Sequence, residues 1–326
     1  MIKVVKTNEL IESEWKQLTD GFNICFHTNH SAKHLQKYYC NTILGYSYHA
    51  LDINEDGVLR GYNSFVPFEY IYKNRVVLGG ISGGTYVLPE YRNDVFIFME
   101  LMSSLFKHCK NEGMVLKLGV PNINSFKYTI KINKAKLVGY LNYYILPIRP
   151  FNIPNIRYLT PLNYISLTFS WGVVSFAYLW SLLVNNKPSK RLFEINTTQD
   201  FYDVRFNDTE KYQKIEEGNF FGYYRVCEEK NSKIVYIMEF REEKTRSLKS
   251  LLFMVKHILK YEKDVAAIMF IGTMNMRQPL LFKLPFRFEP KHLPLTVNIF
   301  NNDKQMLDEA VNMNSWDFSL INFDAR

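Results

Sequence analysis

The sequence lacks the residue patterns that define several common classes of protein. Its four cysteines are scattered over 326 residues without a CxxC pair, which argues against a zinc site and a small disulfide framework. It has no P-loop, no nicotinamide fingerprint and no Ser/His/Asp arrangement. No segment has the composition typical of disorder. We therefore expect a globular, cytoplasmic protein with reduced thiols and no signal peptide.

Acidic and thiol partners are also missing around the histidines, so we expect no metal site. His27, His30 and His34 lie in an aromatic-rich stretch from Phe22 to Tyr48. Residues 30 and 34 would share one helical face, but no Asp, Glu or Cys stands at a suitable spacing. We predict that these histidines line a substrate site or cap a helix.

The chain is basic overall and rich in aromatic residues. The net charge of +8 favours acidic partners such as nucleotides, phosphates, anionic lipids or RNA. A lysine-rich composition typical of AT-rich genomes explains the same balance without any such partner. The 22 tyrosines and 25 phenylalanines supply ample material for a core in a chain long enough for two domains.

One long segment, from Tyr158 to Asn186, has no charged residue at all. Its apolar part, 162–184, is long enough to span a bilayer, with Arg157, Tyr158, Trp180 and Lys187 as interfacial anchors. Asn163 and Gly172 oppose a span. A helix lying on the membrane face and a helix buried between two domains are the alternatives. We favour the buried interdomain helix, preceded by a Pro-rich linker.

The central stretch, Val76 to Ser125, predicts strand, turn, helix and strand. A Gly-rich apolar run ends at Tyr86-Val87, and a turn through Asp94 follows. Apolar residues from Val95 to Cys109 then recur at helical spacing, and a second apolar run covers 114–120. The free amides at such a helix start can bind phosphate, although the unit also occurs as plain scaffold.

This stretch resembles the GNAT (acyl-CoA N-acyltransferase) superfamily. The resemblance lies in Tyr-Val-Leu-Pro-Glu-Tyr-Arg before the helix and Leu-Gly-Val-Pro-Asn-Ile-Asn-Ser after it. It implies an acetyl-CoA or other acyl-CoA cofactor, with the pantetheine arm between two splayed strands. The implied cofactor-binding residues are Tyr86, Val87, Arg92, Asn93, Asp94, Val95, Phe96 and Asn124. Val95 and Ile97 replace the small residues of the family loop, and Asp94 adds a negative charge there.

The resemblance also implies fold and domains. We predict an α/β (α+β) protein with two tandem GNAT-like domains, each a mixed, mostly antiparallel sheet flanked by helices. The boundaries are 1–150 for the acyltransferase domain, 151–190 for the linker and apolar helix, and 191–326 for a degenerate second copy. The loop before the helix of that copy, 240–245, has no glycine and two acidic residues, which makes a poor phosphate site.

Acyl transfer needs a base for the amine, an acid for the thiolate and a polarised carbonyl. By resemblance, Glu69 is the candidate base, Tyr128 the candidate acid, and Asn124 lies beside the pantetheine arm. A solvated carboxylate and a packing tyrosine are the structural alternatives for Glu69 and Tyr128. Tyr143 and Tyr144 are further candidates for the acid.

Three functions remain open. The first is an N-acyltransferase acting on an amine or amino sugar, with a small-molecule or lipid-linked acceptor in cell-envelope or polysaccharide biosynthesis. The second is a FemAB-like transferase that uses aminoacyl-tRNA, which suits the basic charge. The third is a non-catalytic binding protein on a degenerate fold. Membrane contact through 162–184 would fit a lipid-linked acceptor.

Overall fold

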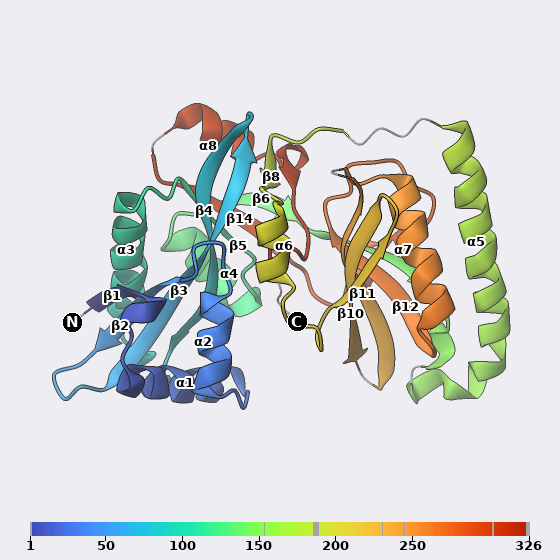
Figure 1. The fold of residues 1–326 in the computed structure, drawn as a ribbon. Helices are drawn as coiled ribbons and strands as arrows, with labels where there is room; N and C mark the ends of the chain where they lie inside the picture. The colour runs from blue at the N-terminus through green and yellow to red at the C-terminus, as the bar shows by residue number, and fades with distance from the viewer. Residues whose placement is uncertain are drawn as a thin grey trace. The chain divides into compact units, whose positions relative to one another are not determined.

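The chain folds into two compact units, each built around a β-sheet with helices packed on it (Figure 1). The computed structural model describes residues 2–152, 154–184, 189–229, 231–243, 245–301 and 303–323. Unit 1 comprises Met1–Tyr140, Leu192–Arg205 and Leu293–Trp316. Unit 2 comprises Leu141–Arg191, Phe206–His292 and Asp317–Arg326. Two mixed sheets with flanking helices confirm the predicted α/β fold class.

Unit 1 contains a sheet whose strands run in the order β1-β2-β3-β4-β5-β14-β6, with β8 beside β3 and β15 beside β8. Along this path every pair is antiparallel except β4 with β5. Its elements are β1 (Ile2–Lys6), α1 (Glu12–Phe26), α2 (Ala32–Cys40), β2 (Tyr48–Ile53), β3 (Leu59–Tyr72), β4 (Arg75–Val87), α3 (Val95–Asn111), β5 (Leu116–Gly119), α4 (Ile123–Lys131), β6 (Lys136–Tyr140), β8 (Phe193–Ile195), α6 (Gln199–Arg205), β14 (Pro294–Ile299), α8 (Lys304–Ala310) and β15 (Trp316–Asp317).

The pleat of β2 and β3 separates two cores in unit 1. Leu51 and Tyr62 point to the face covered by α1 and α2, where they join the first apolar cluster. Ala50 and Phe65, one or three residues away, belong to the cluster under α3. Successive strand residues alternate between faces, so both sides of this sheet are buried.

Unit 2 contains a six-stranded sheet in the order β13-β7-β12-β11-β10-β9. Helix α7 packs on β10 and β11, and α5 packs on α7 and β7. One apolar cluster joins these strands and helices. The elements are β7 (Asn142–Pro147), a 3-10 helix (Pro154–Leu162), α5 (Asn163–Leu183), β9 (Gln213–Glu217), β10 (Phe220–Glu229), β11 (Ser232–Glu242), α7 (Leu248–Tyr261), β12 (Val265–Gly272) and β13 (Phe282–Lys283).

Both units contain the same order of elements at their centre: an antiparallel strand pair, a helix and a strand parallel to the second strand of the pair. In unit 1 these are β3, β4, α3 and β5, and in unit 2 they are β10, β11, α7 and β12. The compact units nevertheless divide the chain differently from the predicted boundaries at 150 and 190. Strand β14 inserts between β5 and β6, whereas β7 pairs with β12.

Two predicted elements are wrong for local reasons. The single strand expected over 137–146 is two strands, β6 and β7, which belong to different sheets. The short helix expected over 278–284 is an irregular loop that ends in β13. There the Gln278 side chain accepts hydrogen bonds from the N–H groups of Leu280 and Leu281, and thereby replaces helical bonding.

The apolar segment is a helix, α5, as predicted, but it is not buried. Only Asn163, Ser170, Val174 and Ala177 are buried along it, and most of its circumference is exposed. Residues 158–183 are apolar and long enough to cross a membrane by length and composition alone. Lys187, one of the predicted interfacial anchors, lies outside the described residues. Lys244, in the loop 240–245 that was predicted to be a poor phosphate site, lies outside them as well.

Candidate active site

The sheet of unit 1 opens where β4 and β5 stop pairing. These parallel strands are in register at Gly79 with Leu116, Gly80 with Lys117 and Ile81 with Leu118. Beyond Ile81, β4 continues to Val87 beside β3, while β5 ends at Gly119 beside β14. The ladder between β4 and β5 therefore lapses in the interior of the sheet, at the carboxyl ends of both strands, where ligands of open α/β sheets bind.

A bulge in β4 lies directly beyond the last paired residues. Ser64 pairs with Gly83 and Tyr62 with Tyr86, so Gly84 and Thr85 together oppose Asn63. Gly84 has a φ of +63°, and a Cβ there would lie 2.5 Å from the Tyr39 hydroxyl, which makes glycine necessary. The Thr85 Oγ1 donates to the Asn63 Oδ1 at 2.6 Å. Bulges re-aim strands at functional sites, and this one bends β4 where it leaves β5.

Lys117 is the residue that the sequence analysis missed. It lies on β5 opposite Gly80, is 2% exposed, and faces the α3 side of the sheet. Its Nζ lies 5.9 Å from the ring centres of both Phe65 and Phe106. A Cβ at Gly119 would stand 3.4 Å from this Nζ, so the side chain runs along β5 toward the end of the strand.

Burial lowers the pKa of Lys117 from 10.5 to about 8. Among the described residues, no hydrogen bond or ion pair to its Nζ is found, and aromatic faces replace water around the ammonium group. A lysine with a pKa of about 8 is neutral in roughly a tenth of the molecules at pH 7, and this neutral form can accept a proton. A lysine inside an otherwise apolar strand, LKLG, was the available sequence signal.

The predicted phosphate site at the start of α3 is capped by the protein itself. The Asp94 Oδ1 accepts a hydrogen bond from the Phe96 N–H at 2.9 Å, which makes Asp94 the N-cap. Val95 and Phe96 are exposed, whereas the Arg92 Nε donates back to the Val87 carbonyl at 3.0 Å. Asp94 therefore satisfies one of the amides that a pyrophosphate would use and places a negative charge beside the rest.

The other predicted cofactor residues lie in different surroundings. The Tyr86 side chain is buried and donates from its hydroxyl to the Leu18 carbonyl at 3.0 Å. Only the backbone of Tyr86 and Val87 can therefore face a ligand. Asn124 is exposed in the first turn of α4, and its N–H donates to the Asn122 side chain, which caps that helix.

The structure does not bring the two predicted catalytic side chains together. Glu69 pairs with Leu78 on β4, on the side of Gly79 away from the opening, and accepts a hydrogen bond from the Asn196 side chain at 2.8 Å. Tyr128 is 50% exposed on α4, and its ring contacts Phe98 of α3 at a centroid distance of 5.9 Å. Glu69 is thus held by Asn196, which also belongs to unit 1, whereas the Tyr128 side chain is accessible to solvent next to α3.

Unit 2 has the same strand order, but its own side chains fill the corresponding place. Beyond the pair Ile237 and Phe270, the Glu239 carboxylate on β11 accepts from the Arg246 Nε at 2.7 Å and from the Arg241 Nε at 3.1 Å. Burial would raise the pKa of Glu239, but the two guanidinium groups outweigh it and lower the pKa to about 2.

The C-terminal segment completes this buried network. Arg246 also donates to Asp317 and to the Ser319 hydroxyl, and Ser319 forms a bridge with Gly272 at the end of β12. These groups satisfy one another and leave no anion-binding surface among them. In unit 2 the buried Glu239 is paired with arginines, whereas in unit 1 the buried Lys117 lies close to the place where β4 and β5 stop pairing. The candidate active site is therefore in unit 1.

Comparisons with known proteins define the class of fold. The sequence matches no family model, and no curated protein is detectably related to it. Solved structures do resemble it. One is a conserved protein from Enterococcus faecalis V583 described as a probable N-acyltransferase, with a TM-score of 0.58 and 15% identity, covering 92% of this chain and 72% of that one.

Two further structures are GCN5-related N-acetyltransferases. The protein from Anabaena variabilis has a TM-score of 0.57 and 8% identity, covering 92% of this chain and 73% of that one. The protein from Kribbella flavida has a TM-score of 0.57 and 9% identity, covering 92% and 71%. The chain therefore has the GCN5-related N-acetyltransferase fold that the sequence resemblance implied.

Proposed function

We propose that the protein is an N-acyltransferase that moves an acyl group from an acyl-CoA thioester to an amine or amino sugar. The observation that carries this proposal is the opening between β4 and β5 beside the bulge at Gly84 and Thr85. An extended thioester arm can pair there with the strand edges that the lapsed ladder leaves. The acceptor belongs to a cell-envelope or polysaccharide precursor in this proposal.

Lys117 is the proposed base. The acceptor nitrogen attacks the thioester carbonyl, the C–S bond breaks, and the amine proton must leave to a nearby group. A neutral Lys117 can take that proton, and its burial keeps a share of it neutral near physiological pH. Glu69 remains the alternative base from the sequence resemblance, although its carboxylate is engaged with Asn196.

The pH profile of turnover separates these two bases. With Lys117 as base, kcat should rise with pH up to an apparent pKa of about 8. Lys117→Met should lose turnover by about 10²-fold or more while acyl-CoA affinity is kept. Glu69→Gln serves as the matched comparison. A full loss in Glu69→Gln with normal turnover in Lys117→Met would assign the base to Glu69.

Substitution of Asp94 tests whether acyl-CoA is the acyl donor. A negative charge next to the pyrophosphate costs about 1 kcal/mol in water, or roughly fivefold in Kd. Asp94→Asn keeps a capping acceptor and removes the charge, so it should bind acetyl-CoA about fivefold more tightly than the natural protein. Thermal shift and calorimetry measure this, and Asp94→Ala controls for loss of the cap.

A transferase that uses aminoacyl-tRNA is the second candidate, and the capped start of α3 favours it, since such a donor needs no pyrophosphate there. Absence of acetyl-CoA binding by both the natural protein and Asp94→Asn would reject the first candidate. Filter binding of aminoacyl-tRNA with a steep salt dependence would then support the second.

A further inference from the structure

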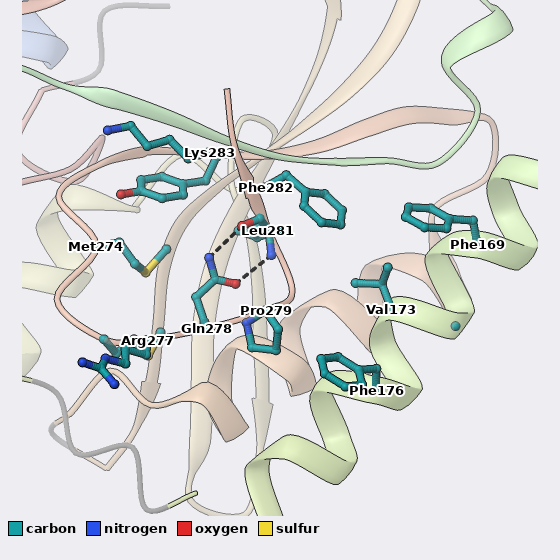
Figure 2. A pocket seen from close by; sticks show the side chains of 13 residues that line it. Phe169, Val173, Phe176, Met274, Arg277, Gln278, Pro279, Leu281, Phe282 and Lys283 are labelled. Atoms are coloured by element: carbon teal, nitrogen blue, oxygen red, sulfur yellow. Dashed lines mark hydrogen bonds between the residues drawn. The ribbon is translucent and has the colours of Figure 1, made fainter. Parts of the chain in front are cut away.

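Unit 2 contains a cavity of about 900 Å³ between α5 and the segment 274–283, and acyl transfer in unit 1 makes no use of it. Figure 2 shows Phe169, Val173 and Phe176 projecting from α5 toward the segment that carries Gln278 to Phe282. Gly172 lines the same wall, and nothing lies within 4 Å of a Cβ built there. This wall is apolar along two turns of the helix.

The opposite wall is held in one shape by a single side chain. The Gln278 Oε1 accepts from the N–H groups of Leu280 and Leu281, both at 2.7 Å, and its Nε2 donates to the Leu281 carbonyl at 2.8 Å (Figure 2). The N–H groups of Leu280 and Leu281 and the Leu281 carbonyl are therefore hydrogen-bonded before any ligand arrives. Phe282 closes this part of the cavity by stacking on Phe169, with ring centres 6.1 Å apart.

The charged residues that line the cavity are both cations. Arg277 and Lys283 contribute to the lining together with the apolar residues, and the lining contains no Asp or Glu. Glu289, half-buried with a pKa raised by burial, interacts electrostatically with Lys283. Lys283 itself is exposed, so a ligand at the mouth can reach its ammonium group.

Helix α5 also exposes large apolar side chains that do not line the cavity. The Trp180 ring lies 6.0 Å from the Phe176 ring at a tilt of 40°, and Tyr164, Trp171, Leu179 and Leu182 are exposed on the rest of the helix. Exposed apolar surfaces of this kind mark interaction sites. The Lys256 Nζ lies 4.6 Å from the Tyr178 ring, so the margin of this surface next to α7 is cationic as well.

We propose that this cavity binds the acyl chain of an anionic lipid, with the head group beside Lys283 and Arg277. The volume lies in the range of small-molecule sites. Walls with satisfied amides suit a chain without polar groups, whereas a peptide would bring amides that find no partner there. The two charged side chains of the lining, Lys283 and Arg277, are both cations and can pair with an anionic head group. This inference is independent of the proposed acyl transfer.

The four tryptophans provide the measurement. Trp15 and Trp316 are buried in unit 1, whereas Trp171 and Trp180 are exposed on α5. In Trp171→Phe the fluorescence change reports Trp180, next to the cavity wall, and in Trp180→Phe it reports Trp171. The probes are sodium dodecanoate below its micelle concentration, dodecanol, hexanoate, and vesicles of phosphatidylglycerol or phosphatidylcholine.

Dodecanoate should give a saturable blue shift in Trp171→Phe, and hexanoate should not. Gly172→Leu fills the cavity and should weaken dodecanoate binding about tenfold or more, while Ser175→Leu introduces the same side chain at an exposed position that does not line the cavity and should change little. Lys283→Gln should remove the preference for dodecanoate over dodecanol. Phosphatidylglycerol vesicles that also shift Trp180 would identify a membrane as the source of the lipid.

Two results would overturn the proposal. One is equal dodecanoate binding by Gly172→Leu and Ser175→Leu, because the cavity would then be irrelevant. The other is a response to vesicles alone, reported by Trp171 and unaffected by Gly172→Leu, which would show a helix resting on a bilayer without an acyl chain in the cavity. Circular dichroism of each variant confirms that it is folded.

Discussion

Replacement of Lys117 by methionine should stabilise the protein. Methionine has nearly the same length and keeps the apolar contacts with Phe65 and Phe106, but it brings no charge into the core under α3. A folded pKa of about 8 against the ordinary 10.5 corresponds to about 3 kcal/mol at neutral pH. We therefore expect Lys117→Met to raise the free energy of unfolding by up to about 3 kcal/mol.

The pH dependence gives the sharper test. Because the folded pKa of Lys117 lies below its unfolded value, the unfolded chain holds more protons between about pH 8 and pH 10.5. The free energy of unfolding of the natural protein should therefore rise with pH in this window relative to that of Lys117→Met, and the difference between the two should narrow by about 2.5 kcal/mol between pH 7 and pH 10.

Urea unfolding at several pH values measures this gap directly. The control is Lys107, which is exposed on α3. Lys107→Met should change the free energy of unfolding only slightly, and by the same amount at every pH. Buried tyrosines such as Tyr39, whose pKa burial raises to about 12, destabilise both proteins equally above pH 10 and cancel in the difference. A difference that does not change with pH, or a natural protein more stable than Lys117→Met at pH 7, would contradict a destabilising charge on the buried Lys117.

Substitutions at three other positions test local features. Asp94→Ala should cost about 1 kcal/mol in urea unfolding because the Phe96 N–H loses its cap, and Asp94→Asn should cost much less. Gly172→Ala should raise thermal stability by the equivalent of about 0.5–1 kcal/mol, since its methyl meets nothing within 4 Å in a helix interior. Arg246→Leu should destabilise by about 3–5 kcal/mol, because it leaves Glu239 buried with a lost partner. In the natural protein, the contribution of the Glu239 carboxylate to the free energy of unfolding should be fully present above about pH 4.5 and should be lost as the pH falls toward 2.

Much of the candidate site in unit 1 follows from the sequence, but its chemistry does not. The glycine-rich strand, the turn through Asp94 and the helix from Val95 predict β4 to within a residue and α3 to within two residues. Local sequence cannot show that Arg92 folds back onto Val87, or that Glu69 is held by Asn196 from a segment far along the chain. These contacts depend on long-range packing, which periodicity does not encode.

Most of the helices and strands, and the class of fold, could be predicted from the sequence, with 137–146 and 278–284 as exceptions. The apolar runs of the strands and the helical spacing along α3 and α7 are local properties, and each strand or helix must bury its own apolar residues. The apolar composition and the length of 162–184 likewise predicted a helix, and α5 covers Asn163–Leu183.

Only the tertiary structure decided which strands share a sheet and which groups are buried. Strand β14 pairs with β5 and β6 although the paired residues, from Pro294 with Tyr140 to Ile299 with Leu116, are 154 to 183 positions apart in the chain, and β7 pairs with β12 instead of β6. The burial of Lys117 and the exposure of α5 follow from those pairings. A pKa and an exposed surface depend on what surrounds a residue in space, and neighbours in sequence supply only a small part of those surroundings.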